Sequence, residues 1–413
     1  MIPSSEPKRI LILTSDMGFG HRSAAKAVAV ALHESYDPNC VVEIVNPMEH
    51  ERSPSFLRGT QSDYDRLVRE MPGFYRFGYE VIGSPLPNAL MESAFTVMLY
   101  EALAETLKRF KPDAIVNTYE SFLAPLRAIF ITTRRFVPLL TVVTDLATVH
   151  RAWFNEVSDR IFVPTQHVYD LGLDHNIDAD RMTISGIPIH PKFARPAEDV
   201  HAQRQALGWR DDLVTVLAVG SKRVANLYES LHVLNHSGLP LQLVVVAGGD
   251  DELFHQLQNI KWHRPAYLYN YVDNMPMLMH SADCIICKAG GLTVTEALAC
   301  GLPMLLVDVL HGQETGNAQY VIQNRAGKRI ENPIDLLETM SHWLENDAAM
   351  LKLRARSAHK LARPRAAFDI ASAAWQAAQQ GVYKKPIIDP ADLSALTDLL
   401  NRFDIRWGRE DQT

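Results

Sequence analysis

The stretch from Asp283 to Asn317 is the part of the sequence that most constrains the fold. It consists of an apolar strand (Cys284 to Cys287), a glycine pair, a short helix, a second apolar strand (Met304 to Val309) and a polar loop. Two strands joined by a helix indicate a parallel α/β sheet, in which ligands bind beyond the carboxyl ends of the strands. A helix that begins at such an end directs free backbone N–H groups towards an anion. The segment therefore predicts a phosphate-binding site.

The polar residues of this segment suit a sugar nucleotide. Gly290 and Gly291 let the backbone approach a diphosphate closely, because they have no Cβ atom. Glu296 lies one turn into the predicted helix, where a carboxylate can accept hydrogen bonds from two ribose hydroxyls. The following loop adds further hydrogen-bonding groups at Gln313, Glu314 and Asn317. The alternative is a structural glycine turn with Glu296 on an exposed helix face.

The same residues resemble the donor site of a known family. AGGLTVTEALACGLP followed by HGQETGNA is similar to the signature of the family 28 glycosyltransferases of GT-B fold. That family includes monogalactosyl- and glucosyldiacylglycerol synthases and the lipid-linked N-acetylglucosaminyltransferase of peptidoglycan synthesis. The resemblance implies that the glycine turn lies at the diphosphate, the helix glutamate at the ribose and the later loop at the sugar. In this segment it assigns donor binding to Gly290, Gly291, Thr293, Glu296, Gln313, Glu314 and Asn317.

Length, charge and cysteine content restrict the class of protein. A chain of 413 residues predicts two domains. The net charge of -7 argues against nucleic acid as a partner, because phosphate backbones require a basic face. The apolar run from Ile10 to Leu13 is too short for a signal peptide or a membrane span. Four cysteines form no disulfide framework, and the CxxC at Cys284 and Cys287 has no second pair of ligands nearby, so we expect a cytoplasmic protein with reduced thiols.

The chain begins with a predicted strand, helix and strand. Arg9 to Ser15 is followed by the helical pattern GFGHRSAAKAVAVALHES and by a strand from Val41 to Val45. The GxGxxS pattern is a near match to a dinucleotide fingerprint, but Asn46 stands where an NAD site would have an acid, which disfavours a redox enzyme. His21 lies at the helix start and hence at the ligand-binding edge of the sheet. Its ordinary pKa of about 6.5 suits proton abstraction near neutral pH, although a lone histidine there can equally be a capping or core group.

Two motifs on this half of the chain also resemble the lipid glycosyltransferases. TSDMGFGHRSAAKA resembles TSxxGxGHxxAAxA, in which the histidine is the proposed base, so the resemblance implies that His21 is catalytic with Gly20 beside it on the acceptor side. VVTDLATVHRAWFNEVSDRIFVPTQ is similar to a family segment whose TDL ends a strand. Asp145 and His150 are therefore second candidates for acid–base chemistry or acceptor contact. The alternative is a turn acid and a surface histidine.

Residues 51–110 interrupt the alternation of strands and helices. Five arginines occur among six aromatic residues between positions 52 and 79. Arginine attracts anionic headgroups and aromatic side chains favour a bilayer interface, so this region predicts contact with an anionic membrane surface that holds a lipid acceptor. DYDRLVREMPGFYRFGYE is similar to the acceptor-side region of the same family. The alternative is a helical insertion whose aromatic residues belong to the core.

The second half of the chain departs from the family at one loop. Family members usually carry a glycine-rich loop after the first strand of this half, whereas this sequence has Gly220, Ser221 and Lys222 followed by Arg223. The cations can replace backbone amides at the diphosphate, or they can be solvated surface groups. AYLYNYVDNMPMLMHSADCIIC resembles the nucleobase segment of the family, in which the backbone at Val272 pairs with uracil, which implies a UDP-sugar donor. ISGIPIHPKF resembles the interdomain connection.

These inferences combine into one prediction of fold and function. We expect two doubly wound α/β domains facing a cleft, with residues 1–195 binding the acceptor and 196–365 the UDP-sugar. Residues 366–413 return to the first domain as a helix and tail. The predicted reaction is inverting transfer of glucose or galactose to diacylglycerol by a protein peripheral to the inner face of the cell membrane. No cofactor is expected, and no metal, since no carboxylate cluster suits Mg²⁺.

Other functions remain open at this stage. N-acetylglucosaminyl transfer to another lipid-linked acceptor is the nearest alternative. A UDP-sugar epimerase of similar fold and a non-catalytic nucleotide-sugar-binding protein are the others. Residue identity does not distinguish glucose from galactose, because the two sugars differ in the orientation of a single hydroxyl.

Overall fold

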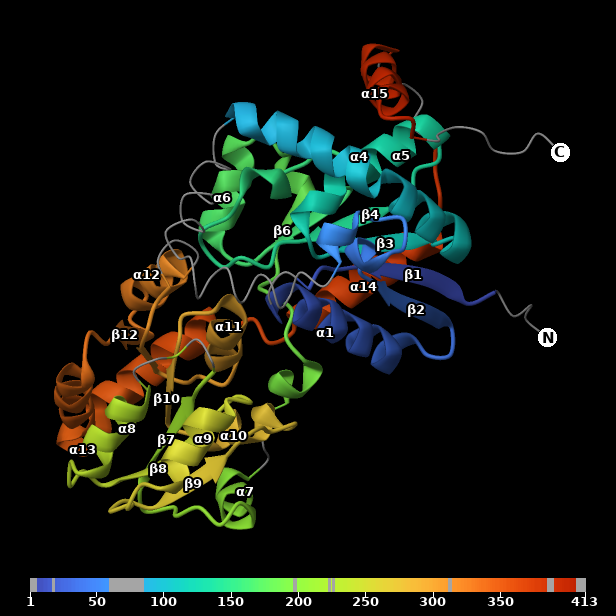
Figure 1. Cartoon of the computed structure of the whole chain (residues 1–413). Helices are drawn as coiled ribbons and strands as arrows, with labels where there is room; N and C mark the ends of the chain where they lie inside the picture. Colours follow the sequence, from blue (N-terminus) through green and yellow to red (C-terminus); the bar gives the residue numbers. More distant parts are fainter. Residues whose placement is uncertain are drawn as a thin grey trace, which may run out of the picture. The chain divides into compact units, whose positions relative to one another are not determined.

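The computed structural model describes residues 6–16, 19–58, 85–195, 199–221, 224, 227–310, 314–384 and 390–405. The chain divides into two compact units (Figure 1). The first comprises Met1–Pro191 with Arg365–Thr413, and the second Lys192–Pro364. Each unit is built on a six-stranded sheet whose paired strands all run parallel. The α/β class and the two doubly wound sheets are therefore as predicted.

The first sheet has the order β2-β1-β3-β4-β5-β6. Its strands are β1 (Lys8–Leu13), β2 (Cys40–Val45), β3 (Ala114–Asn117), β4 (Leu139–Val142), β5 (Arg160–Val163) and β6 (Met182–Ile184). Since β1 pairs with β2 on one side and with β3 on the other, the strand order reverses between β1 and β3. Such a switch point leaves a crevice beyond the carboxyl ends of the two strands, where ligands bind in open α/β sheets.

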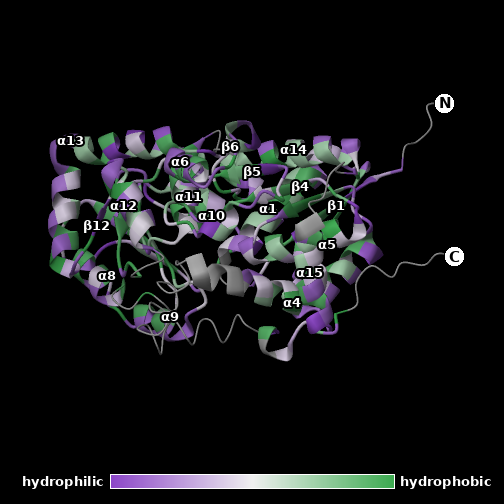
Figure 2. Cartoon of the chain, turned by 90° about the horizontal axis from the view of Figure 1, so that it is seen from above, coloured by the Kyte–Doolittle hydropathy of each residue, from purple (hydrophilic) through white to green (hydrophobic). Residues whose placement is uncertain are grey.

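Helices cover both faces of the first sheet. They are α1 (Phe19–Tyr36), α4 (Pro85–Phe110), α5 (Leu123–Thr133), α6 (Gln166–Asp174), α14 (Ala366–Gln380) and α15 (Pro390–Arg402). Ile10 and Ile12 of β1 pack into the cluster formed with α1 and α14, whereas Leu11 and Leu13 pack into the cluster with α4 and α5. All four side chains are fully buried, which explains why β1 is apolar throughout. In Figure 2 the central strands of this sheet, such as β4, have the colour of hydrophobic residues.

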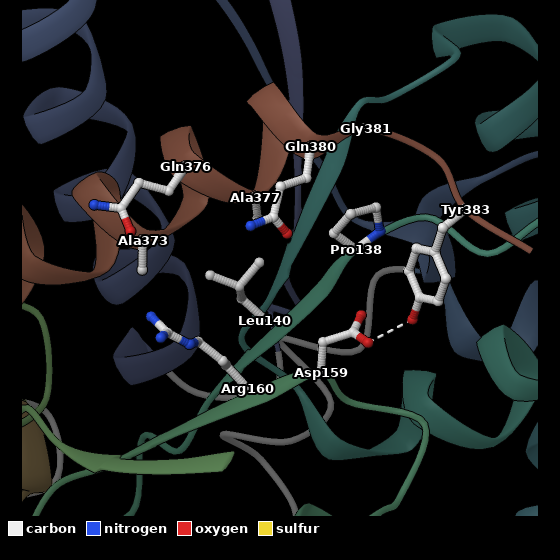
Figure 3. Close-up of a pocket in the computed structure, with 10 residues that line it drawn as sticks. All are labelled: Pro138, Leu140, Asp159, Arg160, Ala373, Gln376, Ala377, Gln380, Gly381 and Tyr383. Carbon is white, nitrogen blue, oxygen red and sulfur yellow. Dashed lines mark hydrogen bonds between the residues drawn. The ribbon is translucent and has the colours of Figure 1, made fainter. Parts of the chain in front are cut away.

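The last part of the chain completes the first unit. Helix α14 lies beside α1 and also contacts β1 and β3 (Figure 1), which confirms the predicted return of the C-terminal helix. Beyond it, Tyr383 forms an antiparallel bridge with Phe136, and its hydroxyl donates to the carboxylate of Asp159 (Figure 3). The other oxygen of Asp159 accepts from the backbone N–H of Leu139 at 2.8 Å. The pocket in Figure 3 therefore lies where β4 and β5 begin, at the opposite edge of the sheet from the predicted catalytic residues.

The second sheet has the order β12-β11-β10-β7-β8-β9. Its strands are β7 (Val214–Val219), β8 (Leu241–Val246), β9 (Ala266–Tyr269), β10 (Cys284–Cys287), β11 (Met304–Leu306) and β12 (Gly327–Arg329). The helices of this unit are α7 (Val200–Ala206), α8 (Leu227–Asn235), α9 (Asp251–Gln258), α10 (Met275–Ser281), α11 (Gly291–Ala299), α12 (Thr315–Gln323) and α13 (Pro333–Leu361). Here the strand order reverses between β7 and β10, since β7 pairs with β8 on its other side.

Two features of the second unit follow directly from its sequence. Cys284 and Cys287 are buried free thiols of strand β10, and burial raises the pKa of both. Gly248 has φ of +70°, and a Cβ atom at this position would lie 2.2 Å from the carbonyl oxygen of Gly220. The backbones after β7 and β8 therefore approach closely, and only glycine fits at position 248.

The arginine-rich region is described only in part. Residues 59–84, which carry most of its arginines and aromatic residues, lie outside the described residues. Arg52 forms ion pairs with Glu101 and Glu105 of α4, and Nε of Arg58 donates to the backbone oxygen of Ser53 at 3.2 Å. These two arginines, expected at a membrane surface, thus have partners within the protein.

Within the described residues, no helix is both long and apolar enough to cross a bilayer.

Loss of the Tyr383 hydroxyl is expected to destabilise the first unit. Tyr383→Phe removes a hydrogen bond to a carboxylate, which typically contributes about 1–2 kcal/mol to the free energy of unfolding. Chemical denaturation followed by circular dichroism measures the change. Tyr271→Phe is the matched control, because Tyr271 is 71% exposed. Equal stability of the two variants would show that the contact with Asp159 contributes nothing.

Candidate active site

His21 lies in the first turn of α1, directly beyond the carboxyl end of β1. Its side chain is half-buried, and Gly20 precedes it in the same turn, while Met17 and Gly18 lie outside the described residues. A Cβ atom at Gly20 would meet no other atom within 4 Å. The backbone beside His21 therefore borders open space on the acceptor side predicted from the sequence.

Hydrogen bonds to one ring nitrogen fix the tautomer of His21. Nδ1 lies 2.9 Å from the backbone oxygen of Thr118 and 2.7 Å from Oγ1 of Thr144. A carbonyl oxygen can only accept, so Nδ1 carries the proton and donates to Thr118. In the neutral ring Nε2 is then unprotonated and available to accept a proton. The hydroxyl of Thr118 in turn donates to the backbone oxygens of Leu13 and His21, at 3.1 and 3.2 Å.

The surroundings of His21 keep the ring neutral near pH 7. Burial lowers the pKa of His21, whereas the charge of Asp145 and the hydrogen bond to Thr118 oppose this shift. Burial likewise raises the pKa of Asp145, against the influence of His21, Trp153 and His150. Each group thus favours the charged form of the other, and an imidazolium at His21 would be stabilised by the Asp145 carboxylate.

Aromatic rings and a cap complete this cluster. Tyr119 meets the His21 ring edge-on with centroids 5.0 Å apart, and Trp153 is tilted at 6.3 Å. Nε1 of Trp153 donates to Asp145 at 3.1 Å, and Trp153 is fully buried. Asp145 is therefore a member of the His21 cluster and not the solvated turn acid of the alternative interpretation. His150 caps the 3-10 helix Arg151–Trp153 by accepting from the backbone of Ala152 at 3.2 Å, and it acts on Asp145 electrostatically.

In the second unit, the predicted donor residues lie on both sides of the switch point. Gly220 and Ser221 follow β7, and Gly290 is the N-cap of α11, which follows β10. Helix α11 begins at Gly291, so its free N–H groups lie at the carboxyl edge of the sheet, as predicted. Val272 comes after the edge strand β9. Lys222, Arg223 and Gln313 lie outside the described residues.

Two residues predicted to face the sugar from a loop, Glu314 and Asn317, instead stand at the N-cap and in the first turn of α12 and have partners inside the protein. Glu314 is only 4% exposed and accepts from Nζ of Lys288 at 2.8 Å and from the backbone of Leu310 at 3.1 Å. Nδ2 of Asn317 donates to the backbone oxygen of Ala289 at 3.0 Å. Both side chains thus hold residues 288–289 in place beside the glycine turn. A contact of either with a sugar would be additional to these bonds.

Glu296 and the two threonines of α11 differ in their surroundings. Burial raises the pKa of Glu296 to about 8, so in the ligand-free protein this carboxyl is mostly protonated at neutral pH. Oγ1 of Thr295 donates to the backbone oxygen of Gly291 at 2.7 Å, whereas Thr293 is half-buried in the first turn. Glu296 is therefore the titrating group of the predicted ribose site.

Several residues of the two sites were not found from the sequence. Lys288 was missed although it stands directly before the glycine pair, where a cation can reach a diphosphate. In the first unit the missed residues are Thr118, Tyr119, Glu120, Thr144 and Trp153. Thr118, Tyr119 and Glu120 could have been predicted from the polar run NTYES, which stands at the end of the apolar strand β3.

In the ranges that the structure describes, no three or more His, Cys, Asp or Glu side chains are arranged to hold a metal ion.

Solved structures share this architecture. The TM-score is 0.57 with MurG of Acinetobacter baumannii, at 16% identity and covering 90% of this chain and 100% of that one. It is 0.56 with the calicheamicin glycosyltransferase CalG4, at 14% identity and covering 90% and 99%. For the UDP-GlcNAc 2-epimerase of Neisseria meningitidis it is 0.55, at 14% identity and covering 89% and 100%. Together, the two sheets and these similarities define a protein of the GT-B glycosyltransferase fold.

Sequence comparison then identifies the family. The family model for monogalactosyldiacylglycerol (MGDG) synthase matches residues 21–189, and that for the glycosyltransferase family 28 C-terminal domain matches residues 215–369. A probable chloroplastic monogalactosyldiacylglycerol synthase of Glycine max is 30% identical over 382 residues, which cover 89% of this chain and 71% of the relative. The chloroplastic synthase of Spinacia oleracea is 30% identical over 384 residues, covering 89% and 72%. The chain belongs to the monogalactosyldiacylglycerol synthase family, as the sequence motifs indicated.

The raised pKa of Glu296 predicts that UDP binding depends on pH. If ribose hydroxyls donate to the ionised carboxylate, binding releases a proton below the pKa, and affinity rises with pH until the free carboxyl is ionised. We expect affinity for UDP to increase roughly eightfold between about pH 7 and pH 8.5 and then to level off. Calorimetry in buffers of different ionisation enthalpy measures affinity and proton release together.

Two variants test this assignment. Glu296→Gln is expected to bind UDP more weakly and without proton release across this range. Glu338→Gln, which alters an exposed carboxylate of α13, is expected to behave like the unmodified protein. If Glu296→Gln retains the pH dependence, another group is responsible for it.

Proposed function

We propose that this protein transfers galactose from UDP-galactose to the free hydroxyl of 1,2-diacylglycerol, giving monogalactosyldiacylglycerol and UDP with inversion at the anomeric carbon. The observation that carries the proposal is the 30% identity with a monogalactosyldiacylglycerol synthase along 89% of the chain. The names of such relatives favour galactose over glucose, which the residues alone did not distinguish. The protonation of His21 at Nδ1 supplies the base that the reaction needs.

In the proposed reaction, Nε2 of His21 takes the proton of the acceptor hydroxyl. The hydroxyl oxygen forms a bond to the anomeric carbon of galactose while the bond from that carbon to the diphosphate oxygen breaks. The electron pair leaves with UDP, and this single displacement inverts the configuration. The Asp145 carboxylate stabilises the imidazolium of His21, which then returns its proton to solvent.

The second unit stabilises the leaving group in this proposal. Negative charge grows on the diphosphate and meets the N-terminal amides of α11 and the ammonium group of Lys288 beside them. Ser221 follows β7 on the other side of the switch point and is a further donor. Lys222 and Gln313 are expected to assist from the loops outside the described residues. Because these groups supply the positive potential, the proposed reaction uses no cofactor or metal.

The alternative functions share this fold and are separated by chemistry. The similar structures include an epimerase bound to UDP-GlcNAc as well as glycosyltransferases, and at 14–16% identity they define the fold alone. An epimerase would release no UDP in response to lipid. N-acetylglucosaminyl transfer would require UDP-GlcNAc as the donor. Product analysis with each donor therefore distinguishes the three reactions.

Replacing His21 is expected to abolish transfer but preserve donor binding. With UDP-galactose and diacylglycerol vesicles, the unmodified protein should form galactolipid at the same rate with or without EDTA. His21→Ala should lower kcat by about 10²–10⁴-fold and leave the affinity for UDP unchanged. His33→Ala, at an exposed position of the same helix, is the matched control and should keep the full rate.

Several outcomes would contradict this assignment. Unchanged turnover of His21→Ala would exclude His21 as the base. Preferential use of UDP-glucose or UDP-GlcNAc would overturn the assignment of galactose. Conversion of the donor without lipid would favour the epimerase.

We further propose that the protein acts as a peripheral protein at an anionic membrane surface on the cytoplasmic side. A lipid acceptor requires access to a bilayer, and the arginines at positions 66, 69 and 76 of the sequence, among aromatic residues, support binding to anionic headgroups. The four free cysteines suit a reducing compartment such as the cytoplasm, whereas the names of the relatives cited above place those proteins in the chloroplast.

Flotation with vesicles tests this membrane contact. We expect the protein to float with phosphatidylglycerol vesicles at low salt and to be released at high salt, because ionic attraction is screened. Vesicles of phosphatidylcholine alone are the control and should retain less protein. Equal retention by both vesicles, or by neither, would contradict a role for the arginines.

A further inference from the structure

Glu120 is a half-buried acid beside the proposed catalytic cluster, and the proposed reaction gives it no role. It begins the 3-10 helix Glu120–Phe122, three residues beyond the end of β3. Strand β3 pairs with β1 across the switch point, so Glu120 and His21 follow the two strands that border the crevice. The preceding residue, Tyr119, contacts the His21 ring.

One carboxyl oxygen of Glu120 lacks a partner. Oε2 is inaccessible to solvent and has no hydrogen-bond partner among the residues that the structure describes. A buried polar atom without a partner costs free energy, and in native proteins such atoms are few and often belong to ligand sites. Because the residue as a whole is partly exposed, rotation of the carboxyl can bring this oxygen to a ligand at this edge of the sheet, and the ligand then supplies the missing contact.

The charged neighbours of Glu120 determine its protonation. Asp145, in the loop after β4, is the neighbouring charge that acts on Glu120, and Asp145 itself faces His21 and His150. Burial, and then the charge of Asp145, raise the pKa of Glu120 to about 8, although its own backbone N–H opposes the shift. The hydrogen bond from Trp153 and the two nearby histidines favour the charged form of Asp145, whereas the charge of Asp145 disfavours the charged form of Glu120. At neutral pH Glu120 is a neutral carboxylic acid that can donate a hydrogen bond.

The proposed acceptor needs a donor of this kind. Diacylglycerol has a single O–H group, whose proton goes to His21 in the proposed reaction. Its remaining oxygens belong to two esters and can only accept hydrogen bonds. A carboxylate would repel these oxygens, whereas a protonated carboxyl can bind one of them.

We propose that Glu120 in its protonated form donates a hydrogen bond to an ester oxygen of diacylglycerol adjacent to the reacting hydroxyl, and so helps to select diacylated acceptors. This inference rests on the proposed function and extends it to the specificity of the acceptor site. Glu120 is then a substrate-binding residue, so its substitution is expected to change the KM for the lipid.

Substitutions that keep or remove the donor test the contact. Glutamine retains an N–H donor at all pH values, so Glu120→Gln should keep the KM for dioleoylglycerol within about twofold at any pH. Glu120→Ala should raise this KM about tenfold, a change typical for one hydrogen bond. In the unmodified protein the KM should rise up to about tenfold between about pH 7 and pH 9 as Glu120 ionises. Glu156→Ala, at a carboxylate whose side chain is 78% exposed in the same unit, is the control.

A change of substrate gives an independent test. Dioleylglycerol, which carries ethers where dioleoylglycerol carries esters, lacks the carbonyl oxygens. The unmodified protein and Glu120→Gln should prefer the ester acceptor, whereas Glu120→Ala should discriminate much less. Both acceptors are presented in phosphatidylglycerol vesicles with saturating UDP-galactose, and the affinity for UDP is measured to verify that each variant is folded.

The outcomes separate this inference from the proposed function. If the unmodified protein makes no galactolipid, the proposed function fails and this inference fails with it. If it does, but Glu120→Ala keeps the original KM and preference for the ester, only the role of Glu120 is overturned. A pH-dependent KM that persists in Glu120→Gln would also overturn it, because another group would then be titrating.

Discussion

The hydrogen bond from Nδ1 of His21 to the backbone oxygen of Thr118 is the interaction on which the proposed chemistry of the first unit depends. It joins the helix that follows β1 to the end of β3, across the point where the strand order reverses. Because its acceptor is a backbone carbonyl, the bond also decides which nitrogen is free. Thr144 reaches the same nitrogen from the end of β4, so neighbouring strands fix one ring. A parallel sheet thus positions the proposed general base with polar groups that need not come from adjacent parts of the sequence.

The second unit uses the same geometry for a different purpose. Its glycine turn follows β10, and two buried side chains at the start of α12 hold the residues before it, namely Glu314 through Lys288 and Asn317 through Ala289. Neutralising a buried carboxylate with a lysine is favourable because each charge is costly to bury alone. The same ion pair also fixes the ammonium group of Lys288 beside the glycine turn, 3.5 Å from where a Cβ atom of residue 290 would lie.

Sequence patterns predicted the strands and helices more accurately than they predicted the contacts of individual side chains. Strand β10 has the predicted bounds of Cys284 to Cys287, because a fully buried strand between turn residues is an unambiguous apolar run. The strand predicted at Met304 to Val309 ends at Leu306, since apolar residues continue into the loop. The direction of a side chain is not encoded locally, so Glu314 was expected at the sugar and is buried against Lys288. The hydrogen-bond partners of His21, Thr118 and Thr144, lie 97 and 123 residues away in the sequence, and no sequence pattern near His21 predicts them.

The return of α14 has a consequence for the order in which the chain folds during synthesis. The first unit contains both ends of the chain, so Lys192–Pro364 is topologically an insertion within it. Ile370 and its neighbours in α14 fill the core beside Ile10 and Ile12. On the ribosome, the part of this apolar face that α14 covers, beside α1, therefore stays exposed while the whole second unit is made. The unit that emerges first is consequently the last to be completed, and the nascent chain must be protected from aggregation through this interval.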